Sequence, residues 1–194
     1  MQHKLTACAL AAFLVTQPVL AQDVPMTSQQ ATQLACIGKR IVDAKLSTLM
    51  ATVYASGKTE GADFDKVSLA MDEAMLACKN QHKWTDVQTN IAAEVSMFQI
   101  VLDAYAVRLA AAPGFTDAWF EKLGSVLTAT PEADQVILLD GVWRNDQAVL
   151  KRFTDRLVAA GLPKDSVILS DAMLVMEAKL IVTYSTMDWV DLQP

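Results

Sequence analysis

Residues 166–189, SVILSDAMLVMEAKLIVTYSTMDW, are apolar almost all the way round a helix. A helix without a polar face is enclosed either by other helices or by lipid. Asp171, Glu177 and Lys179 disfavour lipid, because each charge near the centre of a bilayer costs roughly 2.5–3.5 kcal/mol. We therefore expect residues 166–189 to form the central helix of a soluble helical bundle.

Helix signals continue along the chain before this stretch. Thr27 with Gln30 and Thr85 with Gln88 each match a capping box, which satisfies the first backbone amides of a helix. Apolar residues then recur at spacings of three and four. The segments predicted to be helical are 27–57, 63–81, 85–112, 115–126, 130–160 and 166–189. The predicted fold is all-α: a single-domain, up-and-down bundle of five long helices and one short helix.

Two signals conflict within residues 130–160. Residues 136–143 resemble a β-hairpin, with Asp140-Gly141 at the turn between two apolar runs. The helical stripe through Trp143, Phe153 and Leu157, and the start signal Thr130-Pro131, favour a helix. We predict a helix that ends at Gly161-Leu162-Pro163, and Gly141 would allow a kink within it.

The first 21 residues resemble a secretory leader. Lys4 precedes an apolar run over residues 5–15, and Ala21 occupies a position that suits signal peptidase. We expect residues 1–21 to be a cleaved signal peptide and residues 22–194 to be the α-helical domain. The mature protein is then periplasmic or secreted, with no stable membrane insertion after the leader is removed.

The charge of the chain narrows the range of partners. The formal net charge is −6 for the full chain, and removal of Lys4 with the leader makes it more negative. An acidic protein is repelled by the phosphates of nucleic acids. We expect no nucleic-acid partner.

Removal of the leader leaves two cysteines, Cys36 and Cys78, each within a predicted helix. In an oxidising compartment, a disulfide between them would join the first two helices. Gly38 lies less than one turn from Cys36, and we expect it to let the second helix approach closely enough for the bond to form. The rival interpretation is two free thiols.

Met71, Met75, Cys78 and His82 share one face of the second predicted helix. Thioether, thiolate and imidazole groups are the ligands that favour copper(I). Met71, Met75 and His82 are therefore candidate ligands for a soft metal. In the alternative interpretation the methionines fill the core and Cys78 is consumed by the disulfide. The chain lacks the Glu-x-x-His pairs of carboxylate-bridged metal bundles and the Cys-x-x-Cys-His motif of c-type haem, so no cofactor is predicted.

Bulky aromatic residues cluster after Pro113-Gly114. Phe115, Trp119 and Phe120 lie on the short predicted helix, where two adjacent large rings do not easily share one buried face. Exposed aromatic side chains are typical anchors of protein interfaces. The alternative is that this helix caps the end of the bundle and buries its rings.

These patterns favour an exported, non-enzymatic helical bundle that binds a protein partner through Phe115, Trp119 and Phe120. The alternative is a bundle in the periplasm that binds a small ligand or a soft, copper-like metal. A third class, an enzyme, requires Glu177, Tyr184 or His82 to converge with other polar groups in a cavity.

Overall fold

The computed structural model describes residues 26–192, so the predicted leader lies outside the described residues. Nine α-helices, one 3-10 helix and no strand occur within residues 26–192. The all-α prediction is therefore confirmed, although the helices are more numerous and shorter than predicted. None of the described helices is both long enough and apolar enough to span a bilayer.

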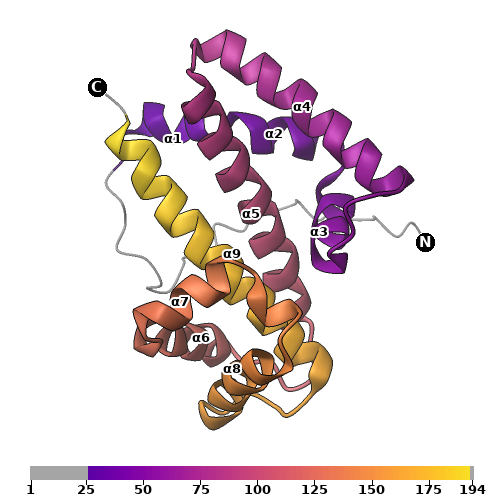
Figure 1. The fold of residues 1–194 in the computed structure, drawn as a ribbon, viewed down its shortest axis with the longest axis vertical. Coiled ribbons are helices and arrows are strands. Elements are labelled where there is room, and N and C mark those ends of the chain that lie inside the picture. Colours follow the sequence, from indigo (N-terminus) through magenta and orange to yellow (C-terminus); the bar gives the residue numbers. More distant parts are fainter. Residues whose placement is uncertain (1–25, 193–194) are drawn as a thin grey trace, which may run out of the picture.

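Two long helices, α5 (Asp86–Ala110) and α9 (Ser166–Asp191), run antiparallel through the centre of the molecule (Figure 1). They make the most extensive helix–helix contact in the fold. Every residue from 171 to 178 of α9 is buried, so the middle of this helix is covered on all sides. The prediction of an innermost last helix is confirmed.

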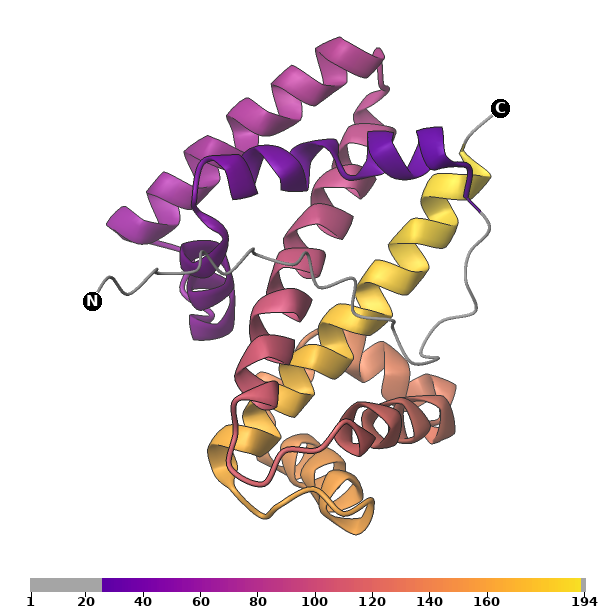
Figure 2. The same cartoon turned by 180° about the vertical axis from the view of Figure 1, so that it is seen from behind.

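The remaining helices gather at the two ends of the α5–α9 pair (Figures 1 and 2). One end is covered by α1 (Ser28–Leu34), α2 (Cys36–Asp43), α3 (Ser47–Ser56) and α4 (Ala62–His82). The other end is covered by α6 (Ala118–Ala129), α7 (Glu132–Leu139), the 3-10 helix η1 (Val142–Arg144) and α8 (Gln147–Ala159).

The hydrophobic core has one cluster at each end of this pair. The larger cluster surrounds α9 from Ile168 to Ile181 and includes fully buried residues such as Leu138, Phe153 and Leu157. The smaller cluster lies among α1, α2, α4 and α5, and receives Trp189 from the last turn of α9. Full burial of a large apolar side chain contributes about 1.5–3 kcal/mol, so α9 stabilises both ends of the fold.

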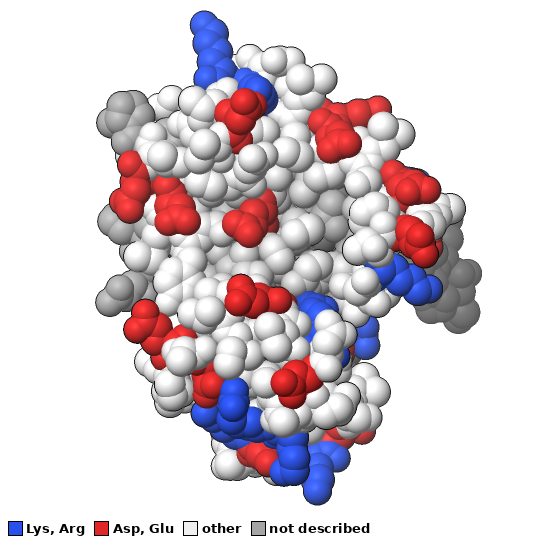
Figure 3. Space-filling view, viewed as in Figure 1, with Lys and Arg blue, Asp and Glu red and all other residues white. Residues whose placement is uncertain are grey.

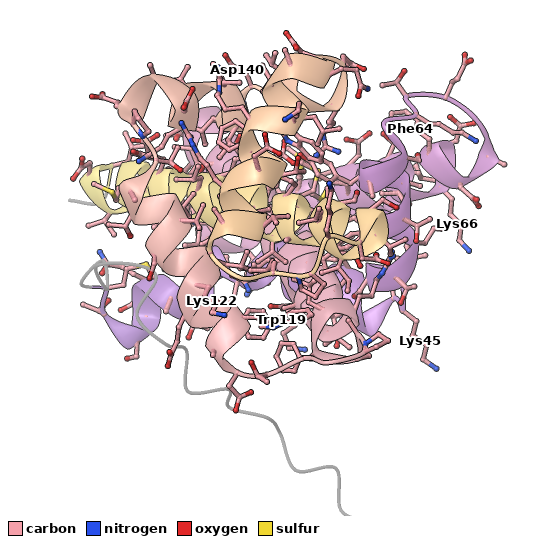
Figure 4. All side chains as sticks on the ribbon, turned by 90° about the horizontal axis from the view of Figure 1, so that it is seen from below. Lys45, Phe64, Lys66, Trp119, Lys122 and Asp140 are labelled. Carbon is pink, nitrogen blue, oxygen red and sulfur yellow. A yellow bond between two sulfur atoms is a disulfide. The ribbon has the colours of Figure 1, made fainter. Side chains whose placement is uncertain are left out.

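The first long helix predicted over residues 27–57 is wrong as a single element, because the chain forms α1, α2 and α3 instead. The break between α2 and α3 is a Schellman turn with Lys45 in the left-handed conformation at φ 59°. The Leu46 amide donates to the Ile41 carbonyl (3.1 Å), and the Lys45 amide donates to the Val42 carbonyl (2.9 Å). Glycine usually occupies the left-handed position of this turn. Because Lys45 stands there instead, the sequence carries no recognisable stop signal. Figure 4 shows Lys45 projecting into solvent at the edge of the molecule.

The helix predicted over residues 130–160 is divided into α7, η1 and α8. The predicted kink at Gly141 is a complete break, with Gly141 left-handed at φ 64°. Asp146 then caps α8 by accepting bonds from the amides of Ala148 (2.8 Å) and Val149 (3.1 Å).

Other boundary signals are confirmed. Both predicted capping boxes form, at Thr27 and at Thr85. After α8, Gly161 is left-handed, and the Leu162 amide donates to the Leu157 carbonyl (3.1 Å) as a Schellman turn requires.

Gly141 and Gly57 provide a matched pair for a stability test, because both have φ 64°. A Cβ at Gly141 would lie 3.3 Å from Glu177 Oε1, whereas a Cβ at Gly57 would have no neighbour within 4 Å. We expect Gly57→Ala to lower the free energy of unfolding by about 1–2 kcal/mol through backbone strain alone. Gly141→Ala should cost more, as measured by urea denaturation. Equal losses would show that the close contact between the added Cβ and Glu177 does not affect stability.

Candidate functional site

The two faces of α4 have different surroundings. Val67, Ala74 and Cys78 point inward and are buried in the smaller core cluster. Leu69 and Leu76 lie about 200° around the helix from Val67 and Cys78, respectively. Their exposed fractions are 62% and 61%. The outward face of α4 therefore presents two leucines, seven residues apart, to solvent.

Two carboxylates lie between these leucines in the sequence of α4. Asp72 and Glu73 are exposed, and neither forms an ion pair or a hydrogen bond with any residue of the described chain. Some other carboxylates are neutralised within the fold: Asp134, for example, accepts from both Arg152 (2.8 Å) and Arg156 (2.6 Å). The outer face of α4, defined here as Leu69, Asp72, Glu73 and Leu76, thus combines exposed apolar surface with uncompensated negative charge.

The disulfide Cys36–Cys78 anchors α4 to α2, with a Cα–Cα distance of 6.1 Å. The predicted cysteine pairing is therefore confirmed. In the chain-entropy model a loop of this length contributes roughly 4 kcal/mol to stability. The ion pair between Lys79 and Asp86 and the bond from Arg40 to Gln81 (3.2 Å) hold the end of α4 near α5 and α2. The outer face is presented by a helix that is fixed from behind.

The role predicted for Gly38 is corrected by the structure. Its close neighbour is Ser96 of α5, and not α4: a Cβ at Gly38 would lie 3.4 Å from Ser96 Cβ. The Gly38 amide also donates to Ser96 Oγ (2.9 Å). The glycine therefore lets α2 approach the central helix α5.

The proposed soft-metal residues lie on the flank of α4. Met71 and Met75 are partly buried and pack against the smaller core cluster. The His82 ring stacks on Trp84 with centroids 5.0 Å apart, and the sulfur of Cys78 is consumed by the disulfide. Within the described residues no three His, Cys, Asp or Glu side chains are grouped to hold a metal ion. Copper binding by Met71, Met75 and His82 stays a prediction.

The aromatic residues proposed as a partner site pack on one another. Phe115 contacts Trp119 and Phe120 edge-on, with ring centroids 5.6 and 5.4 Å apart. Trp119 is only 5% exposed, and both phenylalanines are partly buried against the larger cluster. Figure 4 shows Trp119 on α6 at the end of the bundle. The burial of Trp119 favours the alternative interpretation, a cap on the bundle. A partner site at Phe115, Trp119 and Phe120 stays a prediction.

Glu177 has its own buried cluster. The side chain is 1% exposed and forms an ion pair with Arg144 of η1. The Arg144 guanidinium also lies over the rings of Tyr54 and Trp143, with Cζ 4.5 Å and 4.8 Å from the respective ring centroids. Burial raises the pKa of Glu177, and the positive charge of Arg144 opposes that shift. The same burial raises the pKa of Tyr54.

The three residues considered for an enzyme, Glu177, Tyr184 and His82, lie apart from one another. Glu177 is engaged with Arg144, Tyr184 donates to Gln135 of α7 (3.1 Å), and His82 lies against Trp84. These groups have different partners on different elements. Their side chains do not form one catalytic cluster.

A groove of about 420 Å³ lies between α3 and α5. Its walls are mostly apolar, with Val42 and Val107 among the lining residues and Asp103 and Arg108 as the charged ones. Arg108 also pairs with Asp171 of α9 (3.1 Å). The volume is within the range of small-molecule sites.

Comparison of the chain with protein-family models, with characterised proteins and with solved structures finds no match. The function is therefore inferred from the residues of this chain.

The pairing of Glu177 is tested by Arg144→Met. Removal of Arg144 leaves a buried carboxylate without its partner, so we expect a loss of about 3–5 kcal/mol of unfolding free energy at neutral pH. Arg152→Met is the control: it removes a partly exposed arginine from Asp134, which keeps Arg156, and should cost less than about 1 kcal/mol.

The loss in Arg144→Met should depend on pH. Because burial raises the pKa of Glu177, the folded variant takes up a proton more readily than its unfolded chain. Its stability relative to the wild type should therefore improve as pH falls toward the ordinary glutamate value of about 4.3. Urea denaturation at several pH values measures this change. A deficit that is the same at every pH would contradict an unpaired buried carboxylate.

Proposed function

We propose that this protein is an exported, non-enzymatic binding protein, and that it binds a protein partner through the outer face of α4. The observation that carries the proposal is the exposure of Leu69 and Leu76 around two unpaired carboxylates on one fixed helix. Exposed large apolar side chains grouped on a rigid element are typical of interaction sites.

A periplasmic or secreted location supports this proposal. The Cys36–Cys78 disulfide suits an oxidising compartment, since thiols in reducing compartments stay free. The leader predicted over residues 1–21 points to the same compartment. An exported protein meets its partners outside the cytoplasm.

The second candidate function is small-ligand binding in the groove between α3 and α5. Its volume and apolar walls favour that use. The groove and the outer face of α4 are formed by different residues, so variants of one do not alter the other.

Partner binding is tested with Leu69→Ala/Leu76→Ala. Alanine keeps the helix propensity of α4 and removes the apolar side chains, so far-UV circular dichroism should be unchanged. Bound proteins from an extract of the exported proteins of the source organism are quantified by mass spectrometry. We expect wild-type protein to retain a defined partner and the variant to retain roughly tenfold less, as truncation of two hot-spot side chains at about 1 kcal/mol each would give.

Val136→Ala/Val167→Ala is the matched control. Both valines are exposed large apolar residues, at 49% and 58%, and lie on α7 and α9 instead of α4. This control should retain the partner as the wild type does. Equal retention by the leucine variant, or no specific partner on the wild type, would refute the proposed site.

A further inference from the structure

The outer face of α4 has a specific order of chemistry. Leu69 and Leu76 stand at either end, and Asp72 and Glu73 lie midway between them. Residues three, four and seven positions apart share one side of a helix, so these four side chains form a single stripe about two turns long. Figure 3 shows acidic side chains along α4.

The nearby lysine at the end of α4 does not neutralise this stripe. Lys79 is engaged in its ion pair with Asp86 at the start of α5. Lys66 lies beyond Leu69 and has no ion-pair partner in the described chain, and Figure 4 shows it pointing away from the molecule. The negative charge at the centre of the stripe is therefore available to an external cation.

A second copy of this chain is a poor occupant of the stripe. In a two-fold antiparallel pair of α4 helices, Leu69 of one copy faces Leu76 of the other. The same symmetry places Asp72 opposite Glu73, and four carboxylates then meet at the centre of the contact. Like charges in such positions are destabilising, so pairing of two copies through this stripe is disfavoured.

We propose that the occupant is an amphipathic helix of a protein partner, with lysine or arginine residues placed between two apolar residues seven positions apart. Its apolar residues pack on Leu69 and Leu76, and its central cations pair with Asp72 and Glu73. This inference rests on the proposed function of α4 and adds the chemistry of the partner. An anionic membrane is disfavoured by the same carboxylates.

The experiment uses the purified oxidised protein and synthetic helical peptides. The basic peptide has two leucines seven residues apart, with two lysines at the third and fourth positions after the first leucine. In the acidic peptide glutamates replace the lysines. Fluorescence anisotropy at low and high salt measures the dissociation constants, because salt screens exposed ion pairs.

We expect the basic peptide to bind and the acidic peptide to bind at least tenfold more weakly at low salt. Asp72→Asn/Glu73→Gln should weaken the basic peptide about tenfold and abolish most of its salt dependence, as loss of two exposed ion pairs predicts. The control Glu132→Gln/Asp188→Asn removes the same formal charge from exposed positions elsewhere. It should leave the affinity unchanged.

Each other outcome has a defined meaning. Equal affinity for both peptides, lost in Leu69→Ala/Leu76→Ala, would overturn the basic partner and leave the proposed docking face standing. Peptide binding that the leucine variant does not alter would refute both. Wild-type dimers that strengthen in Asp72→Asn/Glu73→Gln, seen by analytical ultracentrifugation, would identify a second copy as the occupant. Stronger binding to anionic vesicles than to the basic peptide would identify a membrane.

Discussion

The contact between α9 and α5 is the constraint on which the rest of the structure depends. Because α9 is apolar on every side, every side of it has to be removed from water, and α5 covers only one side. The short helices at the two ends of the pair supply the remaining cover. The break between α7 and α8 serves the same end, because η1 places Arg144 against Glu177, the carboxylate buried within α9. A buried charge without such a partner is costly, so this ion pair stabilises the position of η1 against α9.

At the other end, the packing of α4 leaves one of its faces unused. Its inner residues meet α2 and α5, and the disulfide fixes α2 to α4. With the inward side occupied, Leu69 and Leu76 have no protein surface to cover them. Their exposure costs free energy in water, and that cost is recovered only when another surface covers them. The proposed function thus depends on how α4 packs in the fold.

Much of the fold was predictable from local patterns. Capping boxes at Thr27 and Thr85, the stop at Gly161 and the apolar stretch over residues 166–189 are each short-range signals with a direct physical cause. The errors arose where the tertiary structure overrides the local pattern. Lys45 adopts a conformation that favours glycine, so its turn had no recognisable signal. The break at Gly141 precedes Arg144, which pairs with Glu177, a residue 33 positions further along the chain.

The candidate site was missed for a different reason. The stripe of α4 that contains Cys78 indicated metal ligands, and the adjacent rings of Trp119 and Phe120 indicated a partner site on α6. The seven-residue spacing of Leu69 and Leu76 was visible in the sequence. It became informative only once the opposite face of α4 was known to be buried. The buried face already supplies the apolar stripe that packs in the core, so the stripe with Leu69 and Leu76 is left for another contact.

The most direct test of this account is a map of the binding surface by nuclear magnetic resonance. Backbone amide shifts of the isotope-labelled protein are followed as the basic helical peptide is added. If the outer face of α4 binds the peptide, the shifts concentrate on α4, at Leu69, Asp72, Glu73 and Leu76, with little change elsewhere. Shifts centred on the groove between α3 and α5, or on the aromatic residues of α6, would contradict it.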